Sequence, residues 1–194
     1  MKKVILTLAI MLLAFGVSNS GVYTFNPSPA DMYDLDHGYY YGWGIDHDFS
    51  GETISGVRLT ITDINNWWPE PNVLFMHLVD DMSAGLTVYE DNNPDISDAY
   101  DGQGVLIDAW TDYDGGPRGD FVTISYDFAS LGILDEFISY AADGNFGFGV
   151  DPDCHFFNDK FSLTVVTDAP EPTTMLLFAM GLVGGGILRK KFSA

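Results

Sequence analysis

The chain has 194 residues, 46% of them hydrophobic, and a formal net charge of −20. This length accommodates one ordinary domain with flanking signals, and the apolar content excludes a chain that is disordered by composition. Five of the eight lysines and arginines lie near the two termini, and without them the net charge would be −25. A body this acidic repels nucleic acid and anionic lipid, so we expect no nucleic-acid partner.

The first segment has the pattern of a secretory signal peptide. Lys2 and Lys3 precede an apolar run over 4–17, and the small residues Ser18 and Ser20 occupy the −3 and −1 positions of a cut after Ser20. The alternative is an N-terminal membrane anchor, but the apolar run is short for a transmembrane helix. We therefore predict an exported protein.

The body contains several segments in which apolar and polar residues alternate. The alternation is clearest over 52–64, 121–128 and 161–167. The residues predicted to face inward are Val57, Leu59, Ile61, Val122, Ile124, Tyr126, Phe128, Phe161, Leu163 and Val165. Shorter strand candidates are 73–79, 85–89, 104–110 and 145–150. A period of two predicts half-buried strands, and the clusters of Asp, Asn, Gly and Pro between them predict turns.

Residues 130–144 break this pattern and predict a helix of about three turns. Ser130 is suited to cap its N-terminus, and Gly144 is suited to end it. The apolar residues at helical spacing are Leu131, Leu134, Phe137, Ile138 and Ala141. Short strands with turn signals at regular intervals and one short helix indicate an all-β fold, an antiparallel β-sandwich of jelly-roll type.

The C-terminal segment combines an uncharged run with a basic cluster. The run over 173–188 would span roughly 24 Å as a helix, a little less than the ~30 Å hydrocarbon core of a bilayer. Arg189, Lys190 and Lys191 follow it and would stay on the cytoplasmic side. We predict a transmembrane helix here, with the acidic body facing outward.

Pro170, Glu171 and Pro172 precede this run, and the three features together resemble the PEP-CTERM sorting signal of exported bacterial proteins. A second Pro-Glu-Pro at 69–71 has neither the apolar helix nor the basic cluster. The resemblance implies recognition by an exosortase, a membrane-embedded processing enzyme, and delivery to the cell surface or an exopolysaccharide matrix. A plain C-terminal anchor would have the same physical pattern.

This organisation predicts three parts: a signal peptide over 1–20, a sandwich domain over 21–168, and a sorting signal over 169–194. The domain carries a second resemblance, to a family of small exported bacterial domains that commonly have this sorting signal. The segments that carry it are 34–45, 60–68, 73–80 and 141–159. This resemblance implies a sandwich fold and residence outside the cell, and it supplies no catalytic residues.

Asp112, Asp114 and Asp120 lie in one loop and are the candidate ligands of a calcium ion, because calcium takes six to eight oxygen ligands. The loop lacks the Glu at the twelfth position of a calcium-binding hand, and the alternative is an acidic solvated surface. Zinc is less favoured, because the adjacent Cys154 and His155 would point to opposite faces of a strand.

Trp67 and Trp68 are the candidate sugar contacts, because aromatic faces stack on sugar rings and these residues lie at the end of a predicted strand. Adjacent strand residues point in opposite directions, so one of the two should be exposed. The alternative is that both tryptophans fill the core of the sandwich.

The sequence favours an exported, surface-sorted protein without catalytic activity that has a structural or exopolysaccharide-matrix role. One alternative is a carbohydrate-binding module, with or without calcium. Another is a small glycan hydrolase that uses two of the 28 acidic residues. No nucleophile elbow, P-loop or zinc-protease motif is present in the sequence. An exposed aromatic groove would favour binding, and a buried carboxylate with a raised pKa in a pocket would favour an enzyme.

Overall fold

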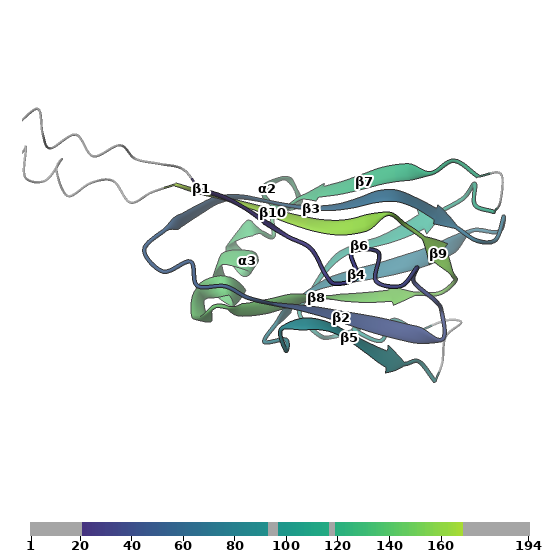
Figure 1. The fold of residues 1–194 in the computed structure, drawn as a ribbon, viewed down its shortest axis with the longest axis horizontal. Helices are drawn as coiled ribbons and strands as arrows, with labels where there is room; N and C mark the ends of the chain where they lie inside the picture. Colours follow the sequence, from purple (N-terminus) through teal and green to yellow (C-terminus); the bar gives the residue numbers. More distant parts are fainter. Residues whose placement is uncertain (1–20, 93–96, 117–118, 169–194) are drawn as a thin grey trace, which may run out of the picture.

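A computed structural model describes residues 21–92, 97–116 and 119–168. In these ranges the chain forms two antiparallel sheets that pack face to face (Figure 1). The first sheet has the spatial order β1 (Gly21–Phe25), β10 (Lys160–Asp168), β3 (Thr53–Asn66) and β7 (Val122–Asp127), and β9 (Phe156–Phe157) pairs with β3. The second sheet has the order β5 (Gly85–Glu90), β2 (Tyr39–Asp46), β8 (Asn145–Pro152), β4 (Asn72–Asp80) and β6 (Val105–Asp112). The predicted β-sandwich is confirmed.

The order of the strands is that of a jelly roll. Without β5 and the two-residue β9, eight strands remain. If these eight are renumbered along the chain, the first sheet has the order 1-8-3-6 and the second sheet has the order 2-7-4-5. Chain neighbours therefore lie mostly in opposite sheets, which is the arrangement of two interleaved Greek keys. Strand β5 is an addition at the edge of the second sheet, beside β2.

The core consists of the inward-facing residues of both sheets. Leu59, Ile61 and Leu163 from the first sheet are fully buried, as the alternating pattern predicts. Phe146 and Phe148 of β8 face them from the second sheet, and full burial of each such side chain contributes roughly 1.5–3 kcal/mol. The prediction that Val122 faces inward is wrong. Val122 is exposed, because it begins β7 at the end of the sandwich rather than over its middle.

The predicted helix is present but begins later than expected. A single turn, α2 (Phe128–Leu131), is capped by Asp127 rather than by Ser130, and it ends at Gly132 in the left-handed conformation. Helix α3 (Leu134–Tyr140) follows and continues into a 3-10 turn, η1 (Ala141–Asp143), which Gly144 ends as predicted. Leu131 and Ile138 are exposed, against prediction, because so short a helix buries one side only; its buried side presents Phe137 and Ala141.

The outer face of the second sheet is partly covered by the segment over 97–104. The ring of Tyr100 lies against Gly149 of β8, where a Cβ atom would come within 2.5 Å of it. This contact explains why β8 is buried along most of its length and does not alternate. Glycine at this position allows the covering segment to approach the strand closely.

Among the described residues, no helix is long and apolar enough to cross a membrane. The predicted signal peptide (1–20) and the predicted transmembrane helix (173–188) lie outside the described ranges. The first and last described strands pair, with Gly21 opposite Thr167, so the two ends of this part lie together near α2 and α3 (Figure 1).

Candidate functional site

The end of the sandwich that lies opposite α3 contains β9 (Figure 1). Several exposed aromatic residues belong to the loops and strand ends at this end. Here β3 and β6 end, and β4 and β7 begin. All exposed tryptophan and phenylalanine side chains of the described ranges are at this end. Tyr113 also lies here, and it is the most exposed aromatic residue of the described ranges. We call this region the aromatic end; its members are Trp67, Trp68, Tyr113, Phe121 and Phe157.

Trp67 and Trp68 follow directly after β3, and both are exposed, at 44% and 57%. The backbone N–H of Trp67 donates to the carbonyl of His155 at 2.8 Å, and its ring lies 4.9 Å from that of Phe157. The backbone N–H of Trp68 donates to the side-chain oxygen of Asn66 at 3.2 Å. Neither tryptophan fills the core, so that alternative is wrong, while sugar contact stays a prediction.

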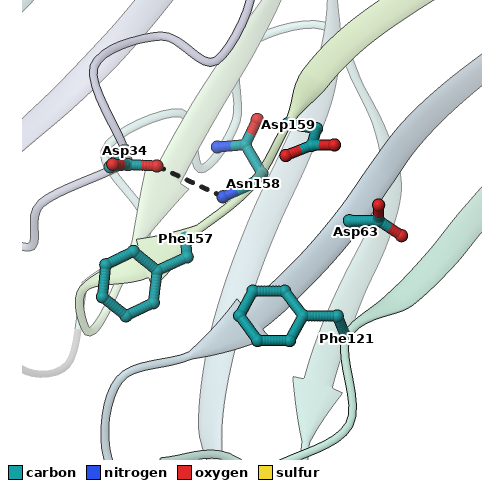
Figure 2. A pocket seen from close by; sticks show the side chains of 6 residues that line it. All are labelled: Asp34, Asp63, Phe121, Phe157, Asn158 and Asp159. Carbon is teal, nitrogen blue, oxygen red and sulfur yellow. Dashed lines mark hydrogen bonds between the residues drawn. The ribbon is translucent and has the colours of Figure 1, made fainter. Parts of the chain in front are cut away.

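An open groove of about 270 Å³ lies beside these rings (Figure 2). We call it the acidic groove; the residues that line it are Asp34, Asp63, Phe121, Phe157, Asn158 and Asp159. Phe157 links it to the aromatic end, because the ring of Phe157 also contacts Trp67. Among the residues that the structure describes, the lining thus combines three carboxylates, one amide and two aromatic rings, and it contains no lysine or arginine.

Asp63 reaches the groove because strand β3 has a bulge. Ile61 pairs with Ile124 and Ile64 pairs with Val122, so two residues of β3 lie opposite one of β7. Asp63 has a φ of +50°, which is uncommon for a residue other than glycine but is tolerated by Asp. Bulges reorient side chains at the ends of sheets, often beside functional sites.

Asp34 reaches the groove through an unusual turn before β2. Met32, Tyr33 and Asp34 all have positive φ values, of 52°, 66° and 52°. Met32 is fully buried, and Asn158 ties the turn to the segment after β9. The backbone N–H of Asn158 donates to Asp34 at 3.3 Å, and its side-chain amide donates to the carbonyl of Asp31 at 2.9 Å. Such conformations persist only where the surrounding structure holds them, and they are common at ligand-binding sites.

The predicted calcium ligands lie nearby, in the loop between β6 and β7. Asp112 is buried, and its two oxygens accept hydrogen bonds from the backbone N–H groups of Asn66 and Asp114, at 2.9 and 3.0 Å. Asp114 and Asp120 are exposed. In the described part of the chain, no three His, Cys, Asp or Glu side chains are grouped in a way that could hold a metal ion. The calcium site stays a prediction.

A second polar cluster lies under the segment over 97–104, on the outer face of the second sheet. Nε2 of His77 lies 2.7 Å from Asp98, and a carboxylate oxygen of Asp151 accepts from the N–H of Ala99 at 2.6 Å. Burial, together with the charges of neighbouring carboxylates, raises the pKa of Asp151 to about 7. Asp151 does not line the acidic groove, and its bond to Ala99 fastens the covering segment. We therefore give it a structural role.

The comparison with protein families concerns the C-terminal segment. Residues 168–191 match the model of the PEP-CTERM protein-sorting motif. The chain carries a PEP-CTERM sorting signal. This signal implies an exported protein that an exosortase recognises, processes and sorts to the cell surface. The predicted sorting residues fall within the match and outside the described ranges; they are Pro170, Glu171, Pro172, Arg189, Lys190 and Lys191. No curated protein matches the chain.

Within the domain that precedes this sorting signal, sequence reasoning identified Trp67 and Trp68 but missed the groove beside them. Asp34 and Asp63 come from two segments that are distant in sequence from Asn158 and Asp159. One local signal was present: in 52–64 the alternation of apolar and polar residues is interrupted at Asp63. That interruption is the sequence mark of the bulge, but it does not indicate which side chains the bulge brings together.

Proposed function

We propose that the processed domain is a non-catalytic protein of the cell-surface matrix, and that it contacts polysaccharide through its aromatic end. The observation that carries the proposal is the gathering of exposed Trp67, Trp68 and Phe121 beside the acidic groove. Aromatic faces present apolar surface at low entropic cost, and they suit the C–H faces of sugar rings. Exposed apolar patches with polar rims commonly mark interaction sites.

The position of this end on the domain supports the proposal. Strand β10 begins at Lys160, near the groove, and ends at Asp168 on the opposite side of the sandwich. The sorting motif starts at residue 168. The aromatic end therefore lies at the far end of the domain from the point where the sorting motif begins, which leaves it accessible to matrix polymers during sorting.

Absence of catalysis is part of the proposal. A hydrolytic site needs a carboxylic acid whose pKa is raised and which faces the substrate. In the described ranges the aspartate with a strongly raised pKa is Asp151, and it is bound to Ala99 away from the groove. Incubation with the polysaccharides that bind should release no new reducing ends, and their release would contradict this part of the proposal.

The central experiment is co-sedimentation with insoluble polysaccharides, including the exopolysaccharide of the producing cell. Trp68→Ala should weaken binding at least fivefold, because loss of an exposed aromatic contact costs about 1 kcal/mol or more. Leu131→Ala is the matched control, since Leu131 is an exposed apolar residue of α2 at the opposite end. Equal binding by the wild-type protein and the Trp68 variant would contradict the proposal.

A further inference from the structure

The first and last strands of the domain meet around the carboxylate of Glu52, which directly precedes β3. Gly21, the first residue of β1, lies opposite Thr167 of β10, and Figure 1 shows these two strand ends side by side. The hydroxyl of Tyr23 donates to one oxygen of Glu52 at 2.6 Å, and the hydroxyl of Thr167 donates to the other. This carboxylate therefore joins β1 and β10 to the start of β3.

The backbone at the start of β1 lies close to this carboxylate. A Cβ atom on Gly21 would lie 2.7 Å from the hydroxyl oxygen of Thr167 and 3.4 Å from an oxygen of Glu52. The first of these distances is too short for a real Cβ atom, so the site is built for glycine. A backbone nitrogen lies about 2.5 Å from the Cβ position of its own residue, so the nitrogen of Gly21 is within about 6 Å of the carboxylate.

Glu52 carries a charge that no lysine or arginine of the described ranges balances. Its pKa is lowered, chiefly by the hydrogen bond from Thr167, so Glu52 is ionised at neutral pH. Arg58 pairs with Asp127, and Lys160 lies at the other end of β10. The other titratable groups around the carboxylate are Tyr23 of β1, His47 and Asp48 of the loop before β3, and Asp168 of β10. Within the described part of the chain, the site thus lacks a permanent cation.

Removal of the predicted signal peptide supplies a cation at this place. The predicted cut follows Ser20 and falls directly before the first residue of β1. Hydrolysis by a signal peptidase adds one water to the bond between Ser20 and Gly21. Ser20 leaves with a carboxylate, and the nitrogen of Gly21 becomes an amine that takes up a proton at neutral pH. A neutral amide nitrogen is thus replaced by an ammonium group within the range in which opposite charges interact strongly with Glu52.

We propose that Glu52 binds the new N-terminal ammonium group of Gly21, and that removal of the signal peptide completes this site. An ammonium group has three donors, so it adds to the two hydroxyl groups that already donate to the carboxylate. The pair fastens β1 to β10 where the sorting motif begins, at residue 168. Removal of the signal peptide thereby stabilises the end of the domain that carries the sorting signal. The pair is independent of the polysaccharide contact proposed above, because it lies at the opposite end of the sandwich.

The test measures the pKa of the Gly21 amine in the chain over 21–194, in detergent, by NMR after ¹³C reductive methylation, which keeps the charge. We expect a pKa at least about 0.5 above the ordinary α-amino range of about 7.7–8.0, and a return towards that range in Glu52→Gln. Glu90→Gln is the matched control, because Glu90 is an exposed glutamate at the end of β5, and it should leave this pKa unchanged. An ordinary pKa in the wild-type chain would overturn the inference. An equal decrease in both variants would also overturn it, because the general negative charge of the protein would then be the cause.

A second measurement leaves Glu52 in place and removes the charge of the amine by acetylation at Gly21 alone. An amine whose pKa is raised by folding contributes stability below its unfolded pKa, and this contribution is lost as the pH rises through the folded value. The free-amine chain should therefore melt at a higher temperature than the acetylated chain at pH 7, and the difference should disappear by about pH 10. Tyr23 stays neutral over this range, because its pKa is raised, chiefly by the hydrogen bond to Glu52. Equal melting temperatures at pH 7 would overturn the inference.

The native protein tests the position of the cut. N-terminal sequencing of the exported protein, purified from the producing cell, should give Gly21 as the first residue. A different first residue would place the ammonium group away from Glu52 and would overturn the inference.

Discussion

The most informative single change in the folded domain is Asp151→Asn. Asp151 is almost fully buried under the segment over 97–104, and its pKa is raised from 3.8 to about 7, first by burial and then by the charges of Asp91, Asp98 and Asp153. Its hydrogen bond from Ala99 opposes this rise without cancelling it. The folded protein therefore holds the proton of Asp151 more tightly than the unfolded chain does.

The direction of the pH effect follows from this difference. A carboxyl group with a folded-state pKa above its unfolded value lowers the free energy of unfolding as the pH rises, here between about 4 and about 7. Below this window both states are protonated, and above it the loss is complete. The two pKa values differ by about three, and each unit corresponds to about 1.4 kcal/mol, so the full loss is at most about 4 kcal/mol.

Asparagine has nearly the same shape, cannot ionise, and keeps an oxygen that accepts from Ala99. Asp151→Asn should therefore unfold with about the same free energy as the wild-type domain near pH 4, and should be more stable above pH 7 by up to about 4 kcal/mol. Urea unfolding of residues 21–168, measured at intervals from pH 4 to pH 8, gives this difference directly. The pKa of Glu52 is also lowered, chiefly by its hydrogen bond from Thr167. The resulting pH dependence of stability is the same in the wild-type protein and the variant, so it does not contribute to the difference between them.

The control is Asp80→Asn, which removes one negative charge from an exposed position. The free energy of unfolding of this variant should differ from that of the wild-type protein by a small and nearly constant amount over the same pH range. If the free energies of unfolding of Asp151→Asn and the wild-type protein differed by a constant amount over this pH range, Asp151 would be ionised in the folded protein as it is in the unfolded chain. Destabilisation at every pH would mean that the charge of Asp151 contributes to folding, and either result would refute the reasoning.

Three further predictions concern the core, the calcium loop and the sorting signal. Phe128→Ala should cost about 3–5 kcal/mol in urea unfolding, because Phe128 is fully buried and its ring packs on Phe137 and Phe148; a cost below about 1 kcal/mol would contradict this packing. If Asp112, Asp114 and Asp120 bind calcium, millimolar calcium should raise the melting temperature of the domain and a chelator should reverse the rise; an unchanged melting temperature would remove the site. Glu171→Ala should leave the full-length chain in the inner membrane, as cell fractionation would detect, whereas unaltered release would count against recognition at this residue.

Local patterns in the sequence predicted the strands that have one buried face. Leu59 and Leu163 lie in segments that alternate strictly, and both are buried where the alternation places them. Strand β2 was not predicted as a strand from periodicity, and the structure explains why. Its residues Tyr41–Ile45 are all buried, because both faces of the strand are covered, so no alternation marks it.

The helix shows the same limit at a finer scale. The apolar spacing over 130–144 correctly predicted a helix that buries Phe137 and Ala141 and ends at Gly144. The place where it begins depends on Gly132, which adopts the left-handed conformation and separates α2 from α3. Spacing alone does not reveal such a break, because glycine is also compatible with the interior of a helix.

The sequence by itself determined the fold class and the sorting signal of this protein. Both are local properties: alternation is set by neighbours along a strand, and the sorting signal is a contiguous segment, over 168–191, with its own charge and hydrophobicity. Only the tertiary structure decided the acidic groove. Asp34, Asp63 and Asp159 come from three separate segments, and they line one groove because a turn with positive φ values and a bulge in β3 both place side chains there once the two sheets pack. No local pattern contains that proximity, because it depends on the register between strands that are distant in the sequence.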